Sequence, residues 1–482
     1  MGIVAGLDSS SVYTRIVVCD TDTGQVVRHG HADHPKEEAT PEAWLHSLGE
    51  AAGGGVLEDV AAIGVAAQPH AVVALDESGA PVRAASPGVG GEDRARTAAL
   101  DAAARELTDA LGGPDTWTRA VGSVPQGGQP VARLRRLARE HPEAARRVAG
   151  VALAQDWLVW QLLGRPARMA TDRGGASSTG YWSPVGGEWR PELVELALGH
   201  AVALPEVLAP AQPAGRTPEG QLISAGTGET MAAAFGLGVG PGDAVLSLGA
   251  SGSVCAVHHA ALPPDSSGAV TAYADATGHH LPVVRTLNAV RVLRGTAELL
   301  GCDLPALSEL ALRSTPGAHG LVFLPYLAGE RVPALPHAAG TLTGLRRESM
   351  KPEHLARAAF EGMLCGLADA ADVLRERGVR IDRFFLLGAA ADLPAVRELA
   401  PALLGAPVVI PAPAAYTALG AARQAAWALG VEQGRLTPDT PPKWPEQDGE
   451  TYHPGDDLPT GKAIRQQYGA VRDTTHPTHP QG

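Results

Sequence analysis

A strand–turn–strand unit occurs twice in this chain of 482 residues, about half a chain apart. In the first copy, apolar residues 3–7 precede a hydroxyl-rich turn at residues 8–11, and residues 14–19 follow as a second apolar run. In the second copy, residues 244–248 and 253–257 flank a tight turn of small residues, Gly249, Ala250, Ser251 and Gly252. A plan repeated at this distance indicates an internal duplication. Together with the glycine-rich break before residue 243, it predicts two domains.

Charge and cysteine content narrow the function classes. The 39 basic and 52 acidic residues give a net charge of −13, which disfavours binding to nucleic acid or to anionic membranes. The four cysteines (Cys19, Cys255, Cys302 and Cys365) lie far apart without metal-ligand spacing, which argues against disulfides or a zinc site. No basic region precedes the apolar N-terminus, and no apolar run reaches membrane-spanning length. The expected location is the cytoplasm.

The pattern of apolar residues along the rest of the chain predicts the approximate positions of helices and strands. We expect a helix that begins at Thr40 and Pro41, as N-cap and first helical residue. Other expected helices span residues 130–148, 157–163, 351–377, 417–429 and 461–471, and short strands span residues 60–65, 71–75 and 384–387. Within residues 130–148, four arginines alternate with leucines at helical spacing: Arg133, Arg135, Arg136 and Arg139. They are interpreted as a solvated helix face rather than an anion-binding patch.

The two small-residue turns suggest a common chemistry. Backbone N–H groups in such a turn can converge on phosphate oxygens without side chains in the way, and hydroxyl groups add further donors. Small-residue hairpins are common, so each turn alone is a weak signal, but two turns could hold a polyphosphate from both sides. Asp8, at the first turn, is a candidate Mg²⁺ ligand because Mg²⁺ usually takes one or two carboxylates together with phosphate oxygens.

One stretch carries a more specific motif. Residues 323–333 read Phe-Leu-Pro-Tyr-Leu-Ala-Gly-Glu-Arg-Val-Pro, which resembles the second-domain signature of the FGGY carbohydrate kinases. Residues 247–252 resemble the second phosphate motif of that family. Thr171 and Asp172 with residues 176–180 resemble a substrate-domain segment found especially in xylulokinases. Residues 355–362 and 418–422 resemble two later helices, so the resemblance spans nearly the whole chain and favours the xylulokinase-like branch.

The resemblance implies an α/β protein with the duplicated actin-like (ribonuclease H-like) ATPase fold, in which two domains flank a central cleft. It implies an N-terminal domain at residues 1–240 with the sugar side and first phosphate hairpin, and a C-terminal domain at residues 241–472 with the second hairpin and the adenosine site. Residues 473–482 are expected to be a disordered tail. The implied reaction transfers the γ-phosphoryl group of ATP, with Mg²⁺, to a hydroxyl of a ketopentose such as D-xylulose. Dimers are common in the family, which suggests a homodimer.

By position, the resemblance also assigns site residues. The first phosphate motif falls on Asp8, Ser10, Ser11 and Arg15, with Asp8 expected to be catalytic and to hold the metal. The second phosphate motif falls on Gly249, Ala250, Ser251 and Gly252, and the adenosine turn on Gly388, Ala389 and Ala390. Sugar contacts fall on Gln68, Pro69, His70, Glu92 and Asp93. Glu229 stands where the family has its catalytic Asp, and would accept the proton of the sugar hydroxyl.

Several assigned positions depart from the family pattern. Ser10 replaces a glycine after Asp8, and the adenosine turn has lost two glycines. The largest departure is Glu229, because a misplacement of a catalytic group by ~1 Å can cost about a hundredfold in rate unless the pocket is rebuilt around it. Three interpretations stay open for Glu229: a working base, part of a site that binds without phosphorylating, or a carboxylate at a helix N-terminus.

Three functions are therefore compared. The first is a sugar kinase. The alternative is a non-catalytic sugar- or nucleotide-binding sensor (a pseudokinase) on the same fold. An actin-like ATPase or chaperone is disfavoured because the signature around Gly329, Glu330 and Arg331 belongs to the sugar kinases. His70 is either a sugar contact or a satisfied polar residue, and Asp172 is either part of the substrate site or a turn or cap residue.

Overall fold

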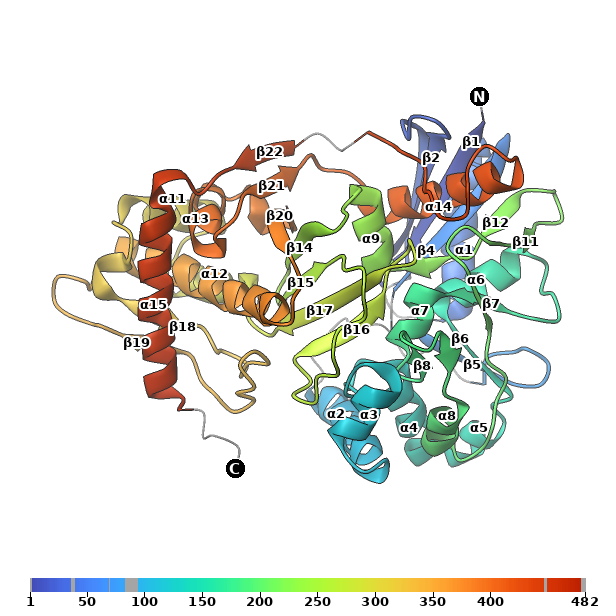
Figure 1. Ribbon diagram of the computed structural model, residues 1–482, viewed down its shortest axis with the longest axis horizontal. Helices are drawn as coiled ribbons and strands as arrows, with labels where there is room; N and C mark the ends of the chain where they lie inside the picture. Colours follow the sequence, from blue (N-terminus) through green and yellow to red (C-terminus); the bar gives the residue numbers. More distant parts are fainter. Residues whose placement is uncertain (1, 36–39, 69, 83–93, 446–448, 478–482) are drawn as a thin grey trace.

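The computed structural model describes the whole chain apart from residues 1, 36–39, 69, 83–93, 446–448 and 478–482. Two mixed β-sheets form the centres of two domains, and helices α9 (Glu229–Leu237) and α14 (Tyr416–Glu432) lie between them (Figure 1). The predicted α/β class and two-domain arrangement are confirmed. Across the described residues, no helix combines the length and the apolar character needed to cross a membrane.

The first sheet contains both early hairpin strands. In spatial order its strands are β11 (Pro213–Arg216), β12 (Leu222–Ser224), β4 (Val60–Ala67), β1 (Ile3–Ser9), β2 (Tyr13–Asp20) and β3 (Val26–Asp33). A short strand, β13 (Thr227–Gly228), pairs with the end of β4. Strands β1, β2 and β3 pair in antiparallel fashion, whereas β4 is parallel to both β1 and β12.

The second sheet repeats this plan. In spatial order its strands are β16 (Val270–Ala274), β17 (His280–Thr286), β15 (Gly252–Ala256), β14 (Gly242–Leu248), β20 (Ile381–Leu387), β21 (Val408–Pro411) and β22 (Gly449–Tyr452). Strands β14, β15 and β17 are antiparallel neighbours, and β14 is parallel to β20, which is parallel to β21. The same pairing pattern as in the first sheet therefore confirms the predicted duplication.

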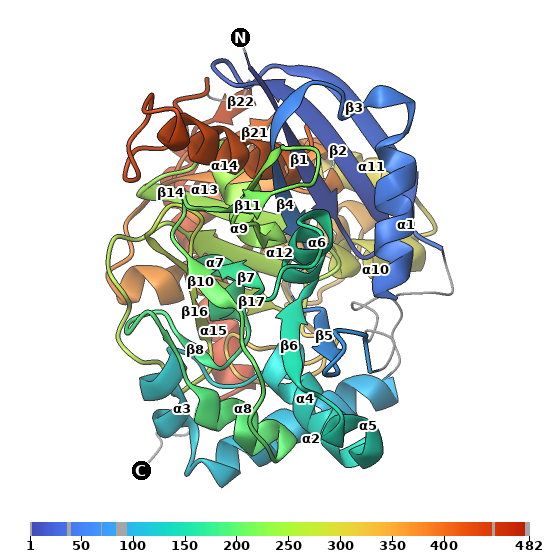
Figure 2. The same ribbon diagram turned by 90° about the vertical axis from the view of Figure 1, so that its right-hand side faces the viewer.

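Short strand pairs and helices complete the fold. The pairs are β5 (Val72–Leu75) with β6 (Gly150–Leu153), β7 (Ala170–Asp172) with β10 (Glu206–Leu208), β8 (Trp182–Ser183) with β9 (Glu188–Trp189), and β18 (Val322–Leu324) with β19 (Thr341–Thr343). The helices of the first domain are α1 (Pro41–Ala51), α2 (Arg94–Ala110), α3 (Pro114–Val121), α4 (Pro130–Glu140), α5 (Pro142–Arg146), α6 (Ala154–Leu162), α7 (Arg173–Ser178) and α8 (Pro191–Leu198). Those of the second are α10 (Val290–Leu300), α11 (Leu304–Arg313), α12 (Pro352–Glu376), α13 (Pro394–Leu404) and α15 (Leu458–Thr475). Figure 2 shows α2–α5 and α8 gathered at the end of the first domain farthest from β1–β3.

The structure corrects three local expectations. Asp8 lies inside β1 rather than in the turn, which is closed by the hydrogen bond from Ser10 N to Tyr13 O. The helix expected over residues 130–148 is two helices, because Pro142 lacks an N–H group and begins a new helix after the break at His141. The disordered tail expected from residue 473 is wrong for residues 473–475, since α15 continues through Thr475. Residues 478–482 lie outside the described part.

Each sheet buries one face against its own helices and the other against α9 and α14. In β14, Ala244, Leu246 and Leu248 join the core beneath α12, whereas Val245 belongs to the core shared with α9 and α14. This shared core also includes Val17 from the first sheet. The alternation follows from the period of two along a strand. A single apolar core therefore connects the two sheets through the two central helices.

Glycines bring these central layers unusually close. A Cβ atom on Gly6 of β1 would lie 1.9 Å from Ala418 O of α14, and one on Gly64 of β4 would lie 1.9 Å from Ala421 O. A Cβ atom on Gly420 would lie 1.9 Å from the carbonyl oxygen of Ala232 in α9. Backbone atoms occupy all three positions, so the contacts cannot be relieved by a rotamer change. The small-residue helix predicted near residues 418–422 is thus required by backbone contact.

We expect Gly420→Ala to destabilise the protein by about 1–3 kcal/mol or more, because the new methyl group meets a backbone carbonyl that side-chain movement cannot displace. Gly49→Ala is the matched control: Gly49 is exposed in α1, a Cβ added there would meet nothing within 4 Å, and the change should be neutral or stabilising by up to about 1 kcal/mol. Thermal unfolding of both variants checks this. Equal melting temperatures would refute the close-contact explanation.

Candidate active site

The first hairpin buries a carboxylate beside a cation and a phenol. Asp8 is 3% exposed in β1 and faces Arg15 across the β1–β2 ladder. Its Oδ2 accepts a long hydrogen bond of 3.5 Å from the Tyr13 hydroxyl, and the Arg15 guanidinium lies 5.0 Å from the centre of the Tyr13 ring. Asp8 Oδ1 has no hydrogen-bond partner within the described residues. One buried carboxylate oxygen is thus available to a ligand.

Glu229 reaches the same region from a different strand. Strand β13 pairs in parallel with the end of β4, with Thr227 opposite Ala66 and Gly228 opposite Ala67. The residues that follow each strand, Gln68 and Glu229, therefore emerge side by side. Glu229 is the first residue of α9, as its position before an alanine-rich run suggested. The structure thus brings together Asp8, Gln68 and Glu229, three of the predicted site residues.

Burial weakens the acidity of both carboxyl groups, and the charge of Glu229 adds to this effect at Asp8. Burial, followed by the charge of Glu229, raises the pKa of Asp8 to about 7, against the opposing effects of Arg15 and the Tyr13 hydrogen bond. Burial also raises the pKa of Glu229. Two carboxyl groups with raised pKa values in one place are typical of functional sites, because a structural carboxylate would normally be paired with a cation.

Asp172 holds the segment that leads to Glu229. As N-cap of α7 it accepts hydrogen bonds from Gly175 N at 2.7 Å and Gly174 N at 2.9 Å. It also accepts one from the Thr227 hydroxyl at 3.0 Å, which ties β13 to α7. The cap interpretation is therefore correct. A second buried link runs from α14, where Gln424 Nε2 donates to Gly226 O at 3.0 Å.

A group of unsatisfied polar atoms marks the predicted sugar side. Within the described residues, Gln68 Oε1, His70 Nδ1, Gln129 Nε2 and Arg133 Nη1 are buried without hydrogen-bond partners. Such atoms are costly unless a ligand satisfies them. Gln68 and His70 were predicted, whereas Gln129 was not, because no local motif distinguishes it. The predicted contacts Pro69, Glu92 and Asp93 lie outside the described residues.

Arg133 contradicts its interpretation as a solvated residue. It is 6% exposed and donates from Nε to Gly128 O at 3.2 Å. The other three arginines do face the surface and pair with Glu106 or Glu140: Arg135, Arg136 and Arg139. The first turn of α4 is buried, so its arginine points inward. The sequence did contain an indication of this burial, because Arg133 lies on the same helix face as the apolar residue Leu137, four positions later.

The second hairpin has an exposed turn that is held in place by the backbone at the start of α10. Gly249, Ala250 and Ser251 are exposed, while Gly252 is buried and its N–H donates to Thr286 Oγ1 at 3.2 Å. The carbonyl oxygens of Gly249 and Ala250 accept hydrogen bonds from the backbone of residues 289–291 at the start of α10. The hydrogen bonds to these two carbonyl oxygens therefore hold the turn in place without a ligand.

The signature residue Glu330 stabilises the segment that holds this turn. Its Oε1 accepts from Leu287 N at 2.7 Å, and its Oε2 accepts from Asn288 Nδ2 at 3.0 Å. Glu330 is 5% exposed and lies behind the turn rather than in contact with it. Because Leu287 and Asn288 lead directly into the start of α10, Glu330 fixes the backbone that holds Gly249 and Ala250.

The predicted adenosine turn adjoins the second hairpin. Gly388 follows β20 with φ 110°, and a Cβ there would lie 2.5 Å from Leu248 O at the end of β14. Ala389 is exposed and Ala390 is buried. At the first hairpin, Ser10 uses its hydroxyl inside its own turn, accepting from Tyr13 N at 3.1 Å, and Ser11 is exposed at the tip. The structure thus groups the predicted ATP residues at two hairpins and one adjoining turn.

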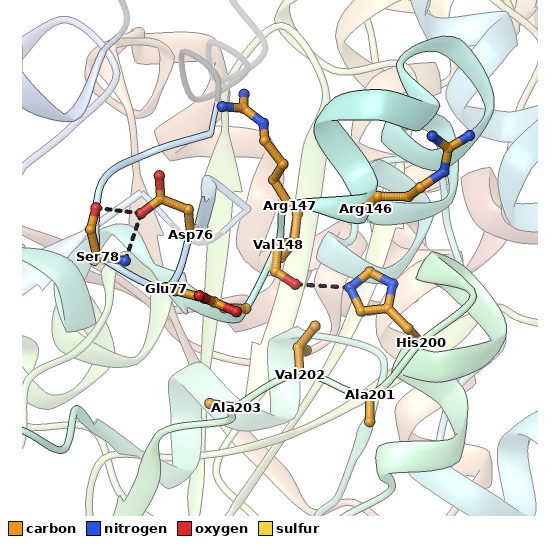
Figure 3. Close-up of a pocket in the computed structure, with 11 residues that line it drawn as sticks. Asp76, Glu77, Ser78, Arg146, Arg147, Val148, His200, Ala201, Val202 and Ala203 are labelled. Carbon is orange, nitrogen blue, oxygen red and sulfur yellow. Dashed lines mark hydrogen bonds between the residues drawn. The ribbon is translucent and has the colours of Figure 1, made fainter.

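A cavity of about 820 Å³ lies elsewhere in the first domain and is lined by residues 76–78 after β5, residues 146–149 at the end of α5 and residues 200–203 after α8 (Figure 3). Its lining groups are largely engaged in local structure: Asp76 accepts from Ser78 within a turn, and His200 Nε2 lies 2.8 Å from Val148 O. None of the predicted site residues lines it. The arrangement of carboxylates and turns between the domains, and not this cavity, carries the candidate chemistry.

A duplicated actin-like fold with two phosphate-type hairpins and paired carboxylates defines an ATP-dependent phosphotransferase. The chain matches the N-terminal domain of the FGGY family of carbohydrate kinases over residues 3–238 and the C-terminal domain over residues 244–429. It belongs to this family, as the motifs predicted, and is an ATP-dependent carbohydrate kinase.

Similar proteins agree on the class of enzyme. The chain is 37% identical to a xylulose kinase of Streptomyces coelicolor over 446 residues, which cover 89% of each chain. It is also 37% identical to a xylulose kinase of Streptomyces rubiginosus over 450 residues, again with 89% of each covered. Among solved structures, a xylulose kinase from Bifidobacterium adolescentis superimposes with a TM-score of 0.88 at 33% identity, covering 98% of this chain and 99% of that one.

The raised pKa of Asp8 predicts an unusual pH dependence of stability. The pKa of Asp8 is about 7 in the folded protein and about 3.8 in the unfolded chain. Between these two pH values, Asp8 is therefore protonated in the folded state and ionised in the unfolded state. Stability is therefore lost as pH rises from about 4 to about 7. We expect Asp8→Asn, which removes this titration, to raise the melting temperature relative to wild type by more at pH 8 than at pH 5.

Asp20, on the adjoining strand, is the matched control with the opposite sign. Hydrogen bonds from Thr23 lower the pKa of Asp20, so its ionised form stabilises the folded protein. We expect Asp20→Asn to lower the melting temperature at both pH 5 and pH 8. Thermal scans at the two pH values measure both variants. An Asp8→Asn difference that is the same at both pH values would show that Asp8 titrates normally.

Proposed function

We propose that this enzyme phosphorylates a hydroxyl of a ketopentose such as D-xylulose, with Glu229 as the general base. The proposal is supported chiefly by the placement of Glu229 beside Gln68, next to buried polar atoms that lack protein partners. The similarity to Streptomyces xylulose kinases favours this sugar over other acceptors.

The proposed roles follow from the position of each group. A sugar hydroxyl beside Glu229 would give its proton to the carboxylate as the oxygen attacks the γ-phosphorus of ATP. Burial raises the pKa of Glu229, which brings its proton affinity closer to what a base needs at neutral pH. His70 would bind a second sugar hydroxyl as a neutral imidazole, since burial and nearby arginines hold its pKa at about 3.

The hairpins supply the proposed nucleotide site. Ser10, Ser11 and Arg15 on one side, and residues 249–252 on the other, would surround the phosphates, with residues 388–390 beside the adenosine. Mg²⁺, which neutralises phosphate charge when bound, would be held near Asp8, whose Oδ1 is free of hydrogen bonds to described residues. No group of three or more His, Cys, Asp or Glu side chains suited to a metal occurs in the described part.

Cytoplasmic location and homodimer formation stay predictions. All four cysteines are free thiols in the structure, in keeping with a reducing compartment.

Replacement of the proposed base provides the direct test. We expect Glu229→Gln to lower kcat with D-xylulose by about 10²–10⁴-fold, because it removes general-base catalysis but keeps the side-chain volume. Glu229→Asp should cost up to about a hundredfold, since the shorter side chain would withdraw the carboxylate by ~1 Å from the position of Glu229. Steady-state ADP release measures both.

Glu195→Gln, an exposed glutamate of α8, is the matched control and should retain wild-type rates. Full activity of Glu229→Gln would exclude Glu229 as the base. Stabilisation by sugar or ATP without ADP release, for a broad panel of ketoses, polyols and sugar acids, would establish the sensor function instead.

A further inference from the structure

Tyr468 links the C-terminal helix to the family signature. Its hydroxyl donates to the hydroxyl of Tyr326 at 3.3 Å, and both side chains are buried. Burial raises the pKa of Tyr468 well above its usual value and that of Tyr326 to about 12, so both hydroxyl groups are neutral near pH 7. Helix α15, which carries Tyr468, lies beyond residue 429, where the match to the C-terminal family domain ends. The bond thus joins a segment outside the family match to a residue inside its signature.

A buried carboxylate holds α15 against the second domain. Arg465 and Arg472 lie three residues before and four residues after Tyr468, so the three side chains share one face of α15. Asp369 of α12 accepts a hydrogen bond from Arg465 Nη2 at 2.8 Å and another from Arg472 Nη1 at 2.6 Å. Because the two arginines flank Tyr468 and bind one carboxylate, a rotation or shift of α15 would break an ion pair. The ion pairs therefore fix where the Tyr468 hydroxyl lies.

Tyr326 begins a turn that carries Glu330. The carbonyl oxygen of Tyr326 accepts from Gly329 N at 3.2 Å, and Gly329 has φ 70°, which glycine adopts without strain. The backbones of Glu330 and Leu335 then pair in both directions, at 2.8 and 2.9 Å. Residues 326–330, called the signature turn below, are thus held at one end by the tyrosine pair and at the other end by Leu335.

The signature turn contacts the segment that holds the second phosphate turn (residues 249–252). Gly329 O accepts from Asn288 Nδ2 at 2.7 Å, and Glu330 Oε2 accepts from the same amide nitrogen at 3.0 Å. The N–H groups of the next residues, 289–291, donate to carbonyl oxygens of the second phosphate turn at 3.0 to 3.4 Å. Hydrogen bonds and short peptide segments therefore connect Tyr468 to the second phosphate turn.

We propose that Tyr468 is a positioning residue for phosphoryl transfer, because its bond to Tyr326 fixes the signature turn and thereby the second phosphate turn. The inference rests on the proposed function, since it takes residues 249–252 to hold the phosphates of ATP. Phosphoryl transfer depends mainly on positioning, so a small displacement of the donors around the phosphates lowers the rate. The competing role is packing alone, in which the ring of Tyr468 fills the core and its hydroxyl group is dispensable.

Removal of the hydroxyl groups tests this bond and keeps both rings. For Tyr468→Phe we expect about a tenfold loss in kcat/KM for ATP, because a misplacement of ~1 Å costs about a hundredfold and the loss of one hydrogen bond should cause a smaller shift. The KM for D-xylulose should not change. Tyr326→Phe should show the same loss, and the double variant should lose no more than either single variant, since all three lack the same bond. Steady-state ADP release measures these constants.

Tyr452→Phe is the matched control. The Tyr452 hydroxyl, in β22, donates to Glu450 and accepts from Arg397 Nη1 at 3.3 Å, so this variant loses a tyrosine hydroxyl outside the signature turn and should keep wild-type constants. Wild-type kinetics in Tyr468→Phe, whatever its melting temperature, would leave packing as its role and overturn the proposal. Additive losses in the double variant would also overturn it, because they would show that the two hydroxyl groups act separately.

Ala250→Glu separates a failure of this inference from a failure of the proposed function. It places a carboxylate on the second phosphate turn and should weaken ATP binding by at least about tenfold through charge repulsion, measured by calorimetry without a sugar. Weaker binding in Ala250→Glu without a kinetic loss in Tyr468→Phe refutes the positioning role and keeps the nucleotide site. Unchanged binding in Ala250→Glu refutes the proposed nucleotide site, and the inference with it. If D-xylulose gives no ADP release, which refutes the proposed acceptor, ATP binding by Tyr468→Phe decides the inference: weaker binding than wild type supports it, and equal binding overturns it.

Discussion

The contact between helices α9 and α14 is the constraint on which the rest of the structure depends. Both helices lie between the sheets, and their backbones approach so closely that a Cβ on Gly236 would lie 2.0 Å from Tyr416 O. Gly6 and Gly64 allow the same approach between α14 and the first sheet. Because α9 begins at Glu229, this packing fixes the carboxylate relative to β1 and β4. The abundance of glycine and alanine in these segments is thus a geometric requirement as well as a compositional bias.

The same contact makes a C-terminal helix part of the first domain's site. Gln424 of α14 is fully buried, accepts from Ser224 Oγ at 2.9 Å and donates to Gly226 O. The turn before Glu229 is therefore held from one side by α14 and from the other by Asp172. Two independent supports keep the carboxylate in place, which suits a site whose catalysis consists mainly of positioning.

Elements set by local pattern could be predicted from the sequence, whereas contacts set by tertiary packing could not. Both hairpins were predicted because short apolar runs on either side of a small-residue turn are local features. The N-cap at Thr40 was predicted for the same reason, and its side chain accepts from Ala43 N at 3.2 Å. Glu229 and Gln68 were found only through the family resemblance, since they lie far apart in the chain and meet through the β4–β13 pairing.

Arg133 shows where such reasoning fails. Four arginines at helical spacing usually form a solvated face, and three of them do here. Whether the fourth meets water depends on what covers the first turn of α4, and the sequence does not contain that information locally. The covering segment includes Thr179 and Gly180, which lie farther along the chain: Thr179 O accepts from Val131 N at 3.0 Å, and a Cβ on Gly180 would lie 2.7 Å from Val131 Cγ1.

This separation has a consequence for specificity. Glu229, the proposed base, belongs to the first domain, as does Arg133, whereas Arg285 and Arg331 belong to the second. The sugar side of the site is therefore complete only when the two domains are in contact, as they are here through Gln126 and Thr271. An acceptor that contacts groups from both domains would stabilise that contact, which links recognition of the acceptor to the arrangement of the phosphate hairpins.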